Sequence, residues 1–329
     1  MKLPSVHPAL RERLLEVVPP EYLEQQHANA AALSLRLNPL RAPPHETRAE
    51  LEGAGIPLRE EPALPLAFTT DAPLRSVQAC AAWREGRVHV QSLPSIAAAL
   101  CLDPRPGHSV LDLCAAPGSK TSHIAALMQN SGTLVAVDSS RTRTFRLQEL
   151  LRLLGARAHC ITAHGERWAR GQREAFDRVL VDAPCSAEGR ILAGDEAAAA
   201  GWSPGKVRRL ASLQKSLLHA AIETLKPGGL LLYSTCTFSP EENELVVERA
   251  LDHAGGTITL EPLPIAVPNS RPALTEVRGR RLPACLECAR RVLPPQEGFF
   301  LALLRKSDRP QSQMGTAGSI HAAEPRIHP

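Results

Sequence analysis

The sequence lacks the segments that would anchor it in a membrane or direct it to secretion. None of its 329 residues lies in an apolar run of about 18, the length that crosses a bilayer. The first residues, MKLPSVHPALRERLLEVV, do not show a basic start, an apolar stretch and a small-residue cleavage site in succession. We therefore expect a cytoplasmic protein with no membrane partner.

A disulfide framework and a metal-binding cysteine pattern are missing as well. The eight cysteines do not follow the spacing of small secreted domains, and several lie in apolar segments, so we expect reduced thiols. Cys285 and Cys288 form a single C-x-x-C with no second pair or histidine partner at zinc-finger spacing. No bound metal is expected, and the thiols are free for chemistry.

Aromatic residues are scarce at 3%, so the chain offers few platforms on which a nucleic-acid base could stack. Arginine is abundant and unevenly placed, and its planar fork of donors suits phosphate. The two clusters are Arg143, Arg146, Arg152, Arg157, Arg167, Arg170 and Arg173, and Arg271, Arg278, Arg280, Arg281, Arg290 and Arg291. Because genomic base composition also produces an arginine-rich, lysine-poor protein, charge alone does not establish an RNA partner.

The pattern along the chain divides it into three parts, with no repeat at a fixed period. Residues 1–75 are predicted to form a small N-terminal α+β module, with a helix in HPALRERLLEVVPPEYLEQQ, a strand in LSLRLNPL and prolines that then interrupt regular structure. Residues 76–306 have the length of a catalytic domain with its own core. Residues 307–329 lack apolar periodicity and are predicted to be disordered.

The larger domain alternates strand and helix patterns. Four segments carry apolar runs of strand length, SVLDLCAAPGSK, TLVAVDSS, RVLVDAPCS and LLLYSTCTFS, and helical periodicity separates them. This alternation predicts an α/β, Rossmann-like fold, with a mostly parallel sheet and helices on both faces. Ligands of such folds bind beyond the carboxyl ends of the strands.

One of these strand ends is suited to a nucleoside cofactor. In VLDLCAAPGSKTSHIA, residues 110–125, a buried strand leads into a small-residue turn that lets a ligand approach the backbone, and a helix follows. Asp138 ends the next strand, where a carboxylate can accept both hydroxyls of a ribose. The G-x-G-x-x-G of a dinucleotide site is absent.

Two cysteines follow two further strands. Cys185 lies in VDAPCSAEG and Cys236 in YSTCTF. A free cysteine is usually a small buried hydrophobe, but each of these lies at a strand terminus among polar residues. Because the two strands should run parallel, both thiols should emerge at the same edge of the sheet, beside the cofactor turn.

The motifs CAAPGSKT, VDAPCS and STCT, in this order, resemble the Nop/Sun family of RNA cytosine-5 methyltransferases, in its bacterial ribosomal RNA form. The resemblance covers roughly residues 78–305, including HVQSLPS and RVLPPQEGFFLALL. DNA cytosine-5 methyltransferases use one cysteine in a Pro-Cys motif, so the two paired motifs are specific. The resemblance implies methyl transfer from S-adenosylmethionine to carbon 5 of a cytosine in RNA.

The resemblance also implies roles for individual residues. Cys236 would add to carbon 6 of the ring, since carbon 5 is a poor nucleophile until electrons enter the ring. Cys185 would assist release, and Asp182 would bind the cytosine edge and also lie against the cofactor. Lys120 would lower the pKa of the nucleophile or orient the base, unless it is only a surface lysine.

The cofactor contacts that the resemblance implies are Cys114, Ala115, Ala116, Pro117, Gly118, Ser119, Lys120, Asp138, Arg143 and Asp182. The sequence departs from the family pattern at one point. The family usually has an acidic residue near the adenine after the third strand, whereas this chain reads CITAHGERW, with Ala163, His164 or Gly165 at that place.

A target base inside a duplex is inaccessible, so the expected substrate is single-stranded, a loop or a flipped base. Ribosomal RNA is the expected partner, with transfer RNA as an alternative, and the N-terminal module resembles the family's RNA-binding extension in partial form. We expect a monomer. Two other functions stay open: a non-catalytic RNA-binding ribosome assembly factor, and a methyltransferase for proteins or small molecules, in which two strand-end thiols would have no purpose.

Overall fold

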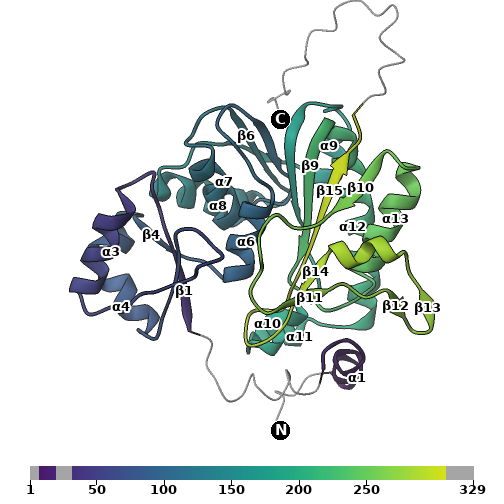
Figure 1. Cartoon of the computed structure of the whole chain (residues 1–329), viewed down its shortest axis with the longest axis horizontal. Coiled ribbons are helices and arrows are strands. Elements are labelled where there is room, and N and C mark those ends of the chain that lie inside the picture. The colour runs from purple at the N-terminus through teal and green to yellow at the C-terminus, as the bar shows by residue number, and fades with distance from the viewer. Residues whose placement is uncertain (1–6, 20–31, 309–329) are drawn as a thin grey trace, which may run out of the picture.

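The computed structural model describes residues 7–19 and 32–308, which form a small antiparallel sheet and a large mixed sheet (Figure 1). The small sheet has the order β2-β3-β1-β4. Its strands are β1 (Leu33–Leu37), β2 (Arg59–Glu60), β3 (Ala67–Thr70) and β4 (Val88–Val90), and its helices are α3 (Pro44–Gly53), α4 (Leu74–Ala79) and α5 (Ala81–Arg84). Strand β4 follows residue 75 in the chain, so the small sheet is completed beyond the boundary that the prolines predict.

The large sheet has the order β11-β14-β15-β9-β8-β5-β6-β7, with β10 paired to β15. Strands β9, β8, β5, β6 and β7 are parallel to one another, and β15 is antiparallel to β9. The bounds are β5 (Ser109–Asp112), β6 (Thr133–Asp138), β7 (His159–Thr162), β8 (Phe176–Asp182), β9 (Leu225–Thr235), β10 (Ile258–Glu261), β11 (Ser270–Pro272), β14 (Arg290–Val292) and β15 (Phe299–Lys306). The predicted α/β fold with a mostly parallel sheet is confirmed.

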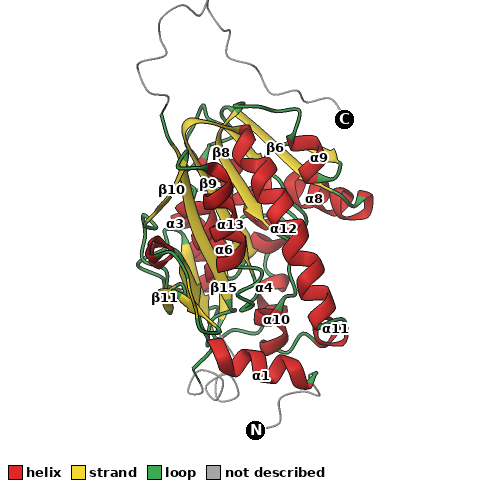
Figure 2. Ribbon diagram, turned by 90° about the vertical axis from the view of Figure 1, so that its right-hand side faces the viewer, coloured by secondary structure: helices red, strands yellow, loops and turns green. Residues whose placement is uncertain are grey.

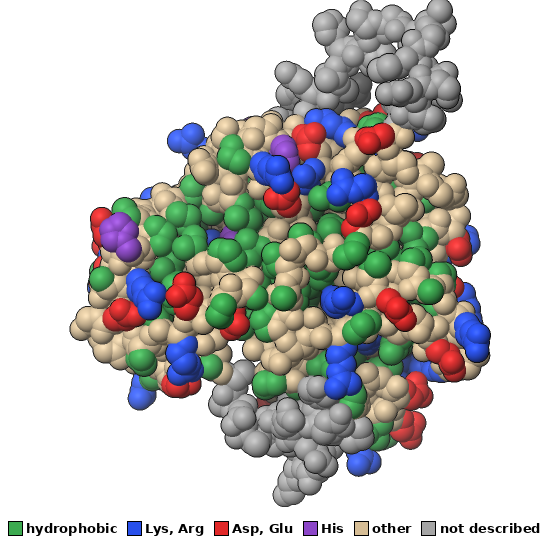
Figure 3. Space-filling model, viewed as in Figure 1, with side chains coloured by type: hydrophobic (Ala, Val, Ile, Leu, Met, Phe, Trp, Pro, Cys, Tyr) green, Lys and Arg blue, Asp and Glu red, His purple; other side chains and the backbone are tan. Residues whose placement is uncertain are grey.

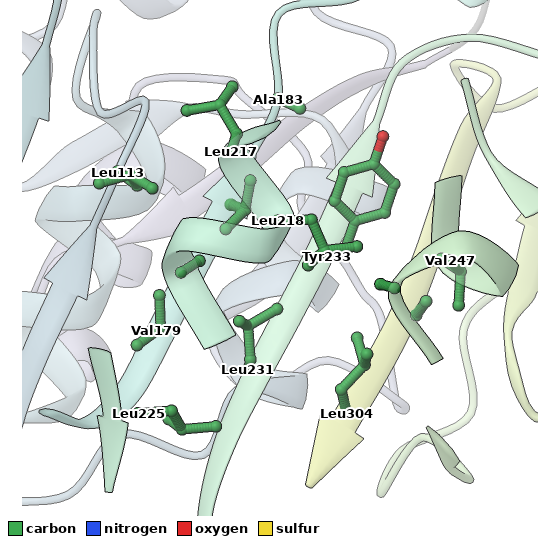
Figure 4. Close-up of a cluster of buried hydrophobic side chains, with 14 of the residues drawn as sticks. Leu113, Val179, Ala183, Leu217, Leu218, Leu225, Leu231, Tyr233, Val247 and Leu304 are labelled. Atoms are coloured by element: carbon green, nitrogen blue, oxygen red, sulfur yellow. The ribbon is translucent and has the colours of Figure 1, made fainter. Parts of the chain in front are cut away.

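Helices cover both faces of this sheet, because side chains alternate along each strand. In β9, Leu231 and Tyr233 face a core shared with α9 (Gly165–Ala169), α12 (Pro204–Thr224) and α13 (Glu244–Ala254), part of which is drawn in Figure 4. Leu230 and Leu232 face the opposite core, which α6 (Leu93–Cys101) and α7 (Ser119–Leu127) cover. Helix α8 (Arg141–Leu154) packs nearby on β6 and β7.

Helix α1 (Pro8–Val17) belongs by its contacts to the catalytic body, and it lies beside α10 (Glu188–Leu192) and α11 (Glu196–Ala200) (Figure 2). Its buried Leu10 and Leu14 form a core cluster with Trp202 and Phe238. Arg13 donates hydrogen bonds to Ser239 Oγ and to Glu241 Oε2, at 3.0 and 2.6 Å. The later part of the predicted N-terminal helix lies outside the described residues, as does the predicted disordered tail from residue 309 onward.

The remaining elements lie between α13 and β15. They are the hairpin of β12 (Glu276–Val277) with β13 (Arg280–Arg281) and the 3-10 helix η1 (Ala284–Cys288). Over the described residues, no helix combines the length and the apolar character needed to span a bilayer.

Candidate active site

The turn between β5 and α7 is shaped by glycine at position 118. Gly118 has φ +113°, in the left-handed region that glycine enters without steric cost. A Cβ built there would lie 2.8 Å from Cδ1 of the buried Leu147 on α8, so either that side chain or the turn would have to shift. Earlier in the same turn, the Ala115 N–H donates to the carbonyl of Val137, at 2.9 Å, which joins the turn to the end of β6.

Asp138 fastens this turn from the end of β6. Its carboxylate accepts hydrogen bonds from the backbone N–H groups of Ala116, at 3.2 Å, and Ser140, at 3.0 Å. Arg143 Nη2 lies 3.3 Å from Asp138 Oδ2 and also donates to the carbonyl of Ala116. The predicted Ala116, Asp138 and Arg143 are therefore one connected unit.

A cavity of about 630 Å³ opens at the carboxyl ends of the parallel strands. Its wall includes eight of the predicted residues, Cys114, Ala116, Pro117, Asp138, Arg143, Asp182, Cys185 and Cys236. Ala115, Gly118, Ser119 and Lys120 do not line it. Ser119 instead lies 3.0 Å from His89 Nε2 of the small sheet.

The two predicted thiols meet at this cavity. Strands β8 and β9 are paired in parallel through Asp182 and Ser234, so the residues just past their ends are neighbours. The Sγ atoms of Cys185 and Cys236 lie 3.3 Å apart, and the Cys236 N–H donates to Cys185 Sγ at 3.3 Å. Contact with Cys236, burial and the nearby charge of Glu242 raise the pKa of the Cys185 thiol well above its usual value.

Asp182 and Lys120 form an ion pair beside the thiols. Lys120 Nζ donates to Asp182 Oδ2 at 2.7 Å, and Ser234 Oγ donates to Asp182 Oδ1 at 2.7 Å. Burial disfavours the ammonium, but the charge and hydrogen bond of Asp182 outweigh it and raise the pKa of Lys120. Because only 12% of its side chain is exposed, Lys120 is not the surface lysine that the sequence left open.

Glu242, a buried carboxylate that the sequence analysis did not single out, contacts the segments that follow both thiols. Glu242 accepts hydrogen bonds from Ser186 N, at 3.0 Å, from Ser186 Oγ and from Gln214 Nε2, at 2.9 Å. Ser186 Oγ is also 2.7 Å from Thr237 Oγ1, so this network joins the residues that follow Cys185 and Cys236. Burial raises the pKa of Glu242 to about 7, against the hydrogen bonds from Ser186 and Gln214.

The segment after β7 does bring an acidic residue to the cavity, although none was expected from the sequence. His164, Gly165 and Glu166 line it, and Glu166 lies in the first turn of α9. Glu166 follows directly after Ala163, His164 and Gly165, the three positions at which the sequence shows no acidic residue. A Cβ at Gly165 would lie 2.8 Å from the carbonyl oxygen of Leu113, so the close approach of α9 to β5 requires glycine there.

The two arginine clusters differ in whether their side chains are free to bind phosphate. In the second, Arg291 is 2% exposed and donates two hydrogen bonds to Glu244, so it is not available to phosphate. Arg278 and Arg280 pair with Glu241 and Glu248. Figure 3 shows lysine and arginine scattered among acidic side chains on the face it draws. From the first cluster, Arg143 and Arg146 reach the cavity.

Among the described residues, no group of three or more histidine, cysteine or acidic side chains is arranged to hold a metal. Cys285 is exposed and Cys288 half-buried in η1.

The sheet order, the glycine turn and the cavity at the strand ends define the class as the Rossmann-like fold of S-adenosylmethionine-dependent methyltransferases. A methyltransferase homolog protein from Pyrococcus horikoshii has a similar crystal structure, with a TM-score of 0.77 and 29% identity over 92% of this chain and 100% of that one. Residues 99–305 match the model of the family described as 16S rRNA methyltransferase RsmB/F. The chain belongs to this family, which confirms the predicted resemblance.

Two curated relatives are similar over the same domain. The tRNA (cytosine(49)-C(5))-methyltransferase of Pyrococcus abyssi is 38% identical over 224 residues, which are 67% of this chain and 71% of that protein. The Ribosomal RNA small subunit methyltransferase F of Vibrio parahaemolyticus is 38% identical over 225 residues, 67% of this chain and 45% of that protein. The match to this chain thus spans less than half of the Vibrio relative.

Proposed function

We propose that this chain transfers a methyl group from S-adenosylmethionine to carbon 5 of a cytosine in RNA, with Cys236 as the nucleophile. The observation that carries the proposal is the contact of two thiols, 3.3 Å apart, in the wall of a cavity that also reaches Asp138 and Asp182. A methyltransferase for proteins or small molecules would need neither thiol. A non-catalytic assembly factor would not need to keep the pair in contact.

The first step activates the ring. The thiolate of Cys236 adds to carbon 6, and the electrons that leave the carbon 5–carbon 6 double bond make carbon 5 nucleophilic. Asp182 binds the cytosine edge near ring nitrogen 3, held by Lys120 and Ser234 on its two oxygens. Bound S-adenosylmethionine would supply an electrophilic methyl group on its sulfonium, and its transfer to carbon 5 would leave the neutral thioether S-adenosylhomocysteine.

The second step releases the product. Cys185, as the thiolate, removes the remaining proton from carbon 5, the double bond re-forms, and the bond between Cys236 and carbon 6 breaks. Carbons 5 and 6 are bonded neighbours, so two sulfurs in contact can act on both. The raised pKa keeps Cys185 protonated in the free site, so the thiol must lose that proton before this step; the thiolate that it then forms is a strong base for the proton on carbon 5.

The residues at the strand ends suit the cofactor. The Cys114–Lys120 turn gives a ligand close access to the backbone, and Asp138 lines the cavity at the end of β6, where a ribose would lie. Glu166 supplies a carboxylate on the wall of the same cavity, where the adenine amino group could donate to it.

Ribosomal RNA is the substrate we favour, because the matching family is described by that substrate. Transfer RNA is the second candidate, since the Pyrococcus abyssi relative acts on it and is matched over 71% of its length. In either RNA the cytosine must be unpaired or flipped to enter the cavity.

The test is methyl transfer with labelled S-adenosylmethionine to unmodified 16S ribosomal RNA and, separately, to transfer RNA. Mass spectrometry of the digested RNA should show 5-methylcytidine with the wild-type protein and none with Cys236→Ala. Label in another nucleoside, or in neither RNA although the cofactor binds, would refute the proposal.

A further inference from the structure

The first two turns of α8, residues 141–148, carry a combination of side chains that the reaction above does not use. Phe145 is 63% exposed, the highest value among the large hydrophobic residues found exposed in the described chain. Every other phenylalanine, tyrosine or tryptophan that the structure describes is buried or half-buried. In a protein with so few aromatic residues, this ring stands on the solvent-facing side of a helix, where polar side chains are usual.

The side chain of Arg146, next to Phe145, is not held by any other residue in the described part of the chain. Arg146 lines the cavity, yet its side chain makes no hydrogen bond or ion pair with the described residues. Its neighbour in the cavity wall, Arg143, differs because it is engaged by Asp138 and Ala116. An arginine that faces a cavity with its donors free is available to an anion from outside the chain.

The start of α8 carries positive charge only, although the cavity that Arg146 lines also holds Asp138, Glu166 and Asp182. Between Asp138 and Glu149 the sequence has no acidic residue, whereas it has Arg141, Arg143 and Arg146. Helix α8 lies at the periphery of the molecule (Figure 2), and Arg143 and Arg146 bring its first turns to the mouth of the cavity. Proteins that bind single-stranded nucleic acid combine such groups: arginine binds the phosphates, and an exposed aromatic ring stacks on a base.

Resting on the proposed function, we propose that the start of α8 is the docking rim for the RNA strand beside the target cytosine. Arg146 binds a phosphate next to the flipped nucleotide, and Phe145 stacks on an unpaired neighbouring base. Residues 145 and 146 point about 100° apart around the helix, so one can face the cavity while the other faces the strand outside it.

The experiment measures the affinity of the full-length protein for a fluorescent single-stranded RNA at several salt concentrations. Phe145→Ala should weaken binding about tenfold with an unchanged salt slope, because a stack involves no ion release. Phe145→Tyr should restore the affinity. Arg146→Gln should weaken binding and reduce the slope of log affinity against log salt by about 0.7, the value for one phosphate contact on a single strand.

Leu15→Ala is the matched control, because Leu15 is also an exposed apolar residue, 46% exposed, but lies on α1, which packs on α10 rather than on α8. It should leave RNA affinity unchanged, and calorimetry should show unchanged cofactor affinity in Phe145→Ala. Wild-type RNA affinity in Phe145→Ala, or a loss that Phe145→Tyr does not restore, would overturn the stacking role. An unchanged salt slope in Arg146→Gln would overturn the phosphate contact. Failure of the wild type to make 5-methylcytidine would refute the proposed function instead.

Discussion

At the scale of single residues, the candidate site depends on side chains that strand ends bring together. Cys185 and Cys236 could be predicted as neighbours because each follows an apolar strand and parallel strands end at one edge. The 3.3 Å separation of their Sγ atoms fits that prediction. Their roles as nucleophile and release base stay predictions, as do those of Asp182 and Lys120.

Glu242 could not be predicted from its surroundings in the sequence. It lies in SPEENE, a polar stretch that is typical of a solvated loop. It is buried because this loop folds over Ser186 and Gln214, which come from distant parts of the chain. Contacts of that kind depend on the completed sheet and leave no local pattern.

Glu242→Gln should change how stability depends on pH. The pKa of Glu242 is about 7 in the folded protein, above its ordinary 4.5, so the folded state favours the protonated acid. That stabilisation is complete below pH 4.5 and is lost as the pH rises through 7. A rise from 4.5 to about 7 corresponds to about 3 kcal/mol. Glutamine stays neutral, so the variant should gain stability relative to wild type over this range, measured by urea unfolding.

The control is the adjacent Glu241→Gln. Burial opposes ionisation of Glu241, but the hydrogen bond and charge of Arg13 outweigh it and lower the pKa to about 2. The stabilisation from this carboxylate is present above pH 4.5 and is lost as the pH falls through 2. Glu241→Gln should therefore be less stable than wild type near pH 7. If the difference in free energy of unfolding between Glu242→Gln and wild type did not change from pH 4.5 to 8, the account of Glu242 would be contradicted.

At the scale of elements, the sequence predicted the strands and the helices between them, since apolar runs and helical periodicity are local. The turn after β5 was predicted as a ligand turn from its small residues. The requirement for glycine at position 118 depends on a tertiary contact, because Leu147 of α8 occupies the space that a Cβ would need. Helix α9 brings Glu166 to the cavity in the same way, through packing that the sequence does not show.

Gly118→Ala should weaken S-adenosylmethionine binding by at least about tenfold, because Leu147 is fully buried and leaves its side chain little room to move out of the way of the turn. Its φ of +113° already strains any other residue, and the Cβ would lie 2.8 Å from Leu147. Gly107→Ala is the control, since Gly107 has φ +87° but nothing within 4 Å of a built Cβ. It should bind the cofactor normally despite a backbone cost of about 1–2 kcal/mol. Equal affinities of the two variants in calorimetric titration would contradict this role of Gly118.

At the scale of the whole molecule, the first helix and the small sheet do not form one unit. The sequence places both within residues 1–75 because they are adjacent in the chain. In the structure, α1 packs instead on Trp202 and Phe238, and Phe238 lies two residues beyond Cys236. Contacts over such a distance in the chain are set by the finished fold, so sequence reasoning had no means to find them.

Leu14→Ala should destabilise the catalytic body by about 2–5 kcal/mol, the usual cost of removing a buried leucine side chain. Leu14 is 1% exposed, whereas the adjacent Leu15 is 46% exposed. Leu15→Ala should change the free energy of unfolding by less than about 0.5 kcal/mol. Thermal and urea unfolding measure both, and equal effects of the two variants would show that α1 does not pack on the body as described.

The central claim is that one thiol opens the reaction and the other closes it, and covalent trapping tests it most directly. Each variant is incubated with RNA and S-adenosylmethionine, denatured in detergent and run on a gel that separates free protein from protein joined to RNA. Cys185→Ala should accumulate a denaturant-resistant adduct because addition proceeds and elimination stalls, and Cys236→Ala should form none. Adducts with Cys236→Ala and none with Cys185→Ala would reverse the assignment, and the absence of adducts in both would contradict covalent catalysis by these two cysteines.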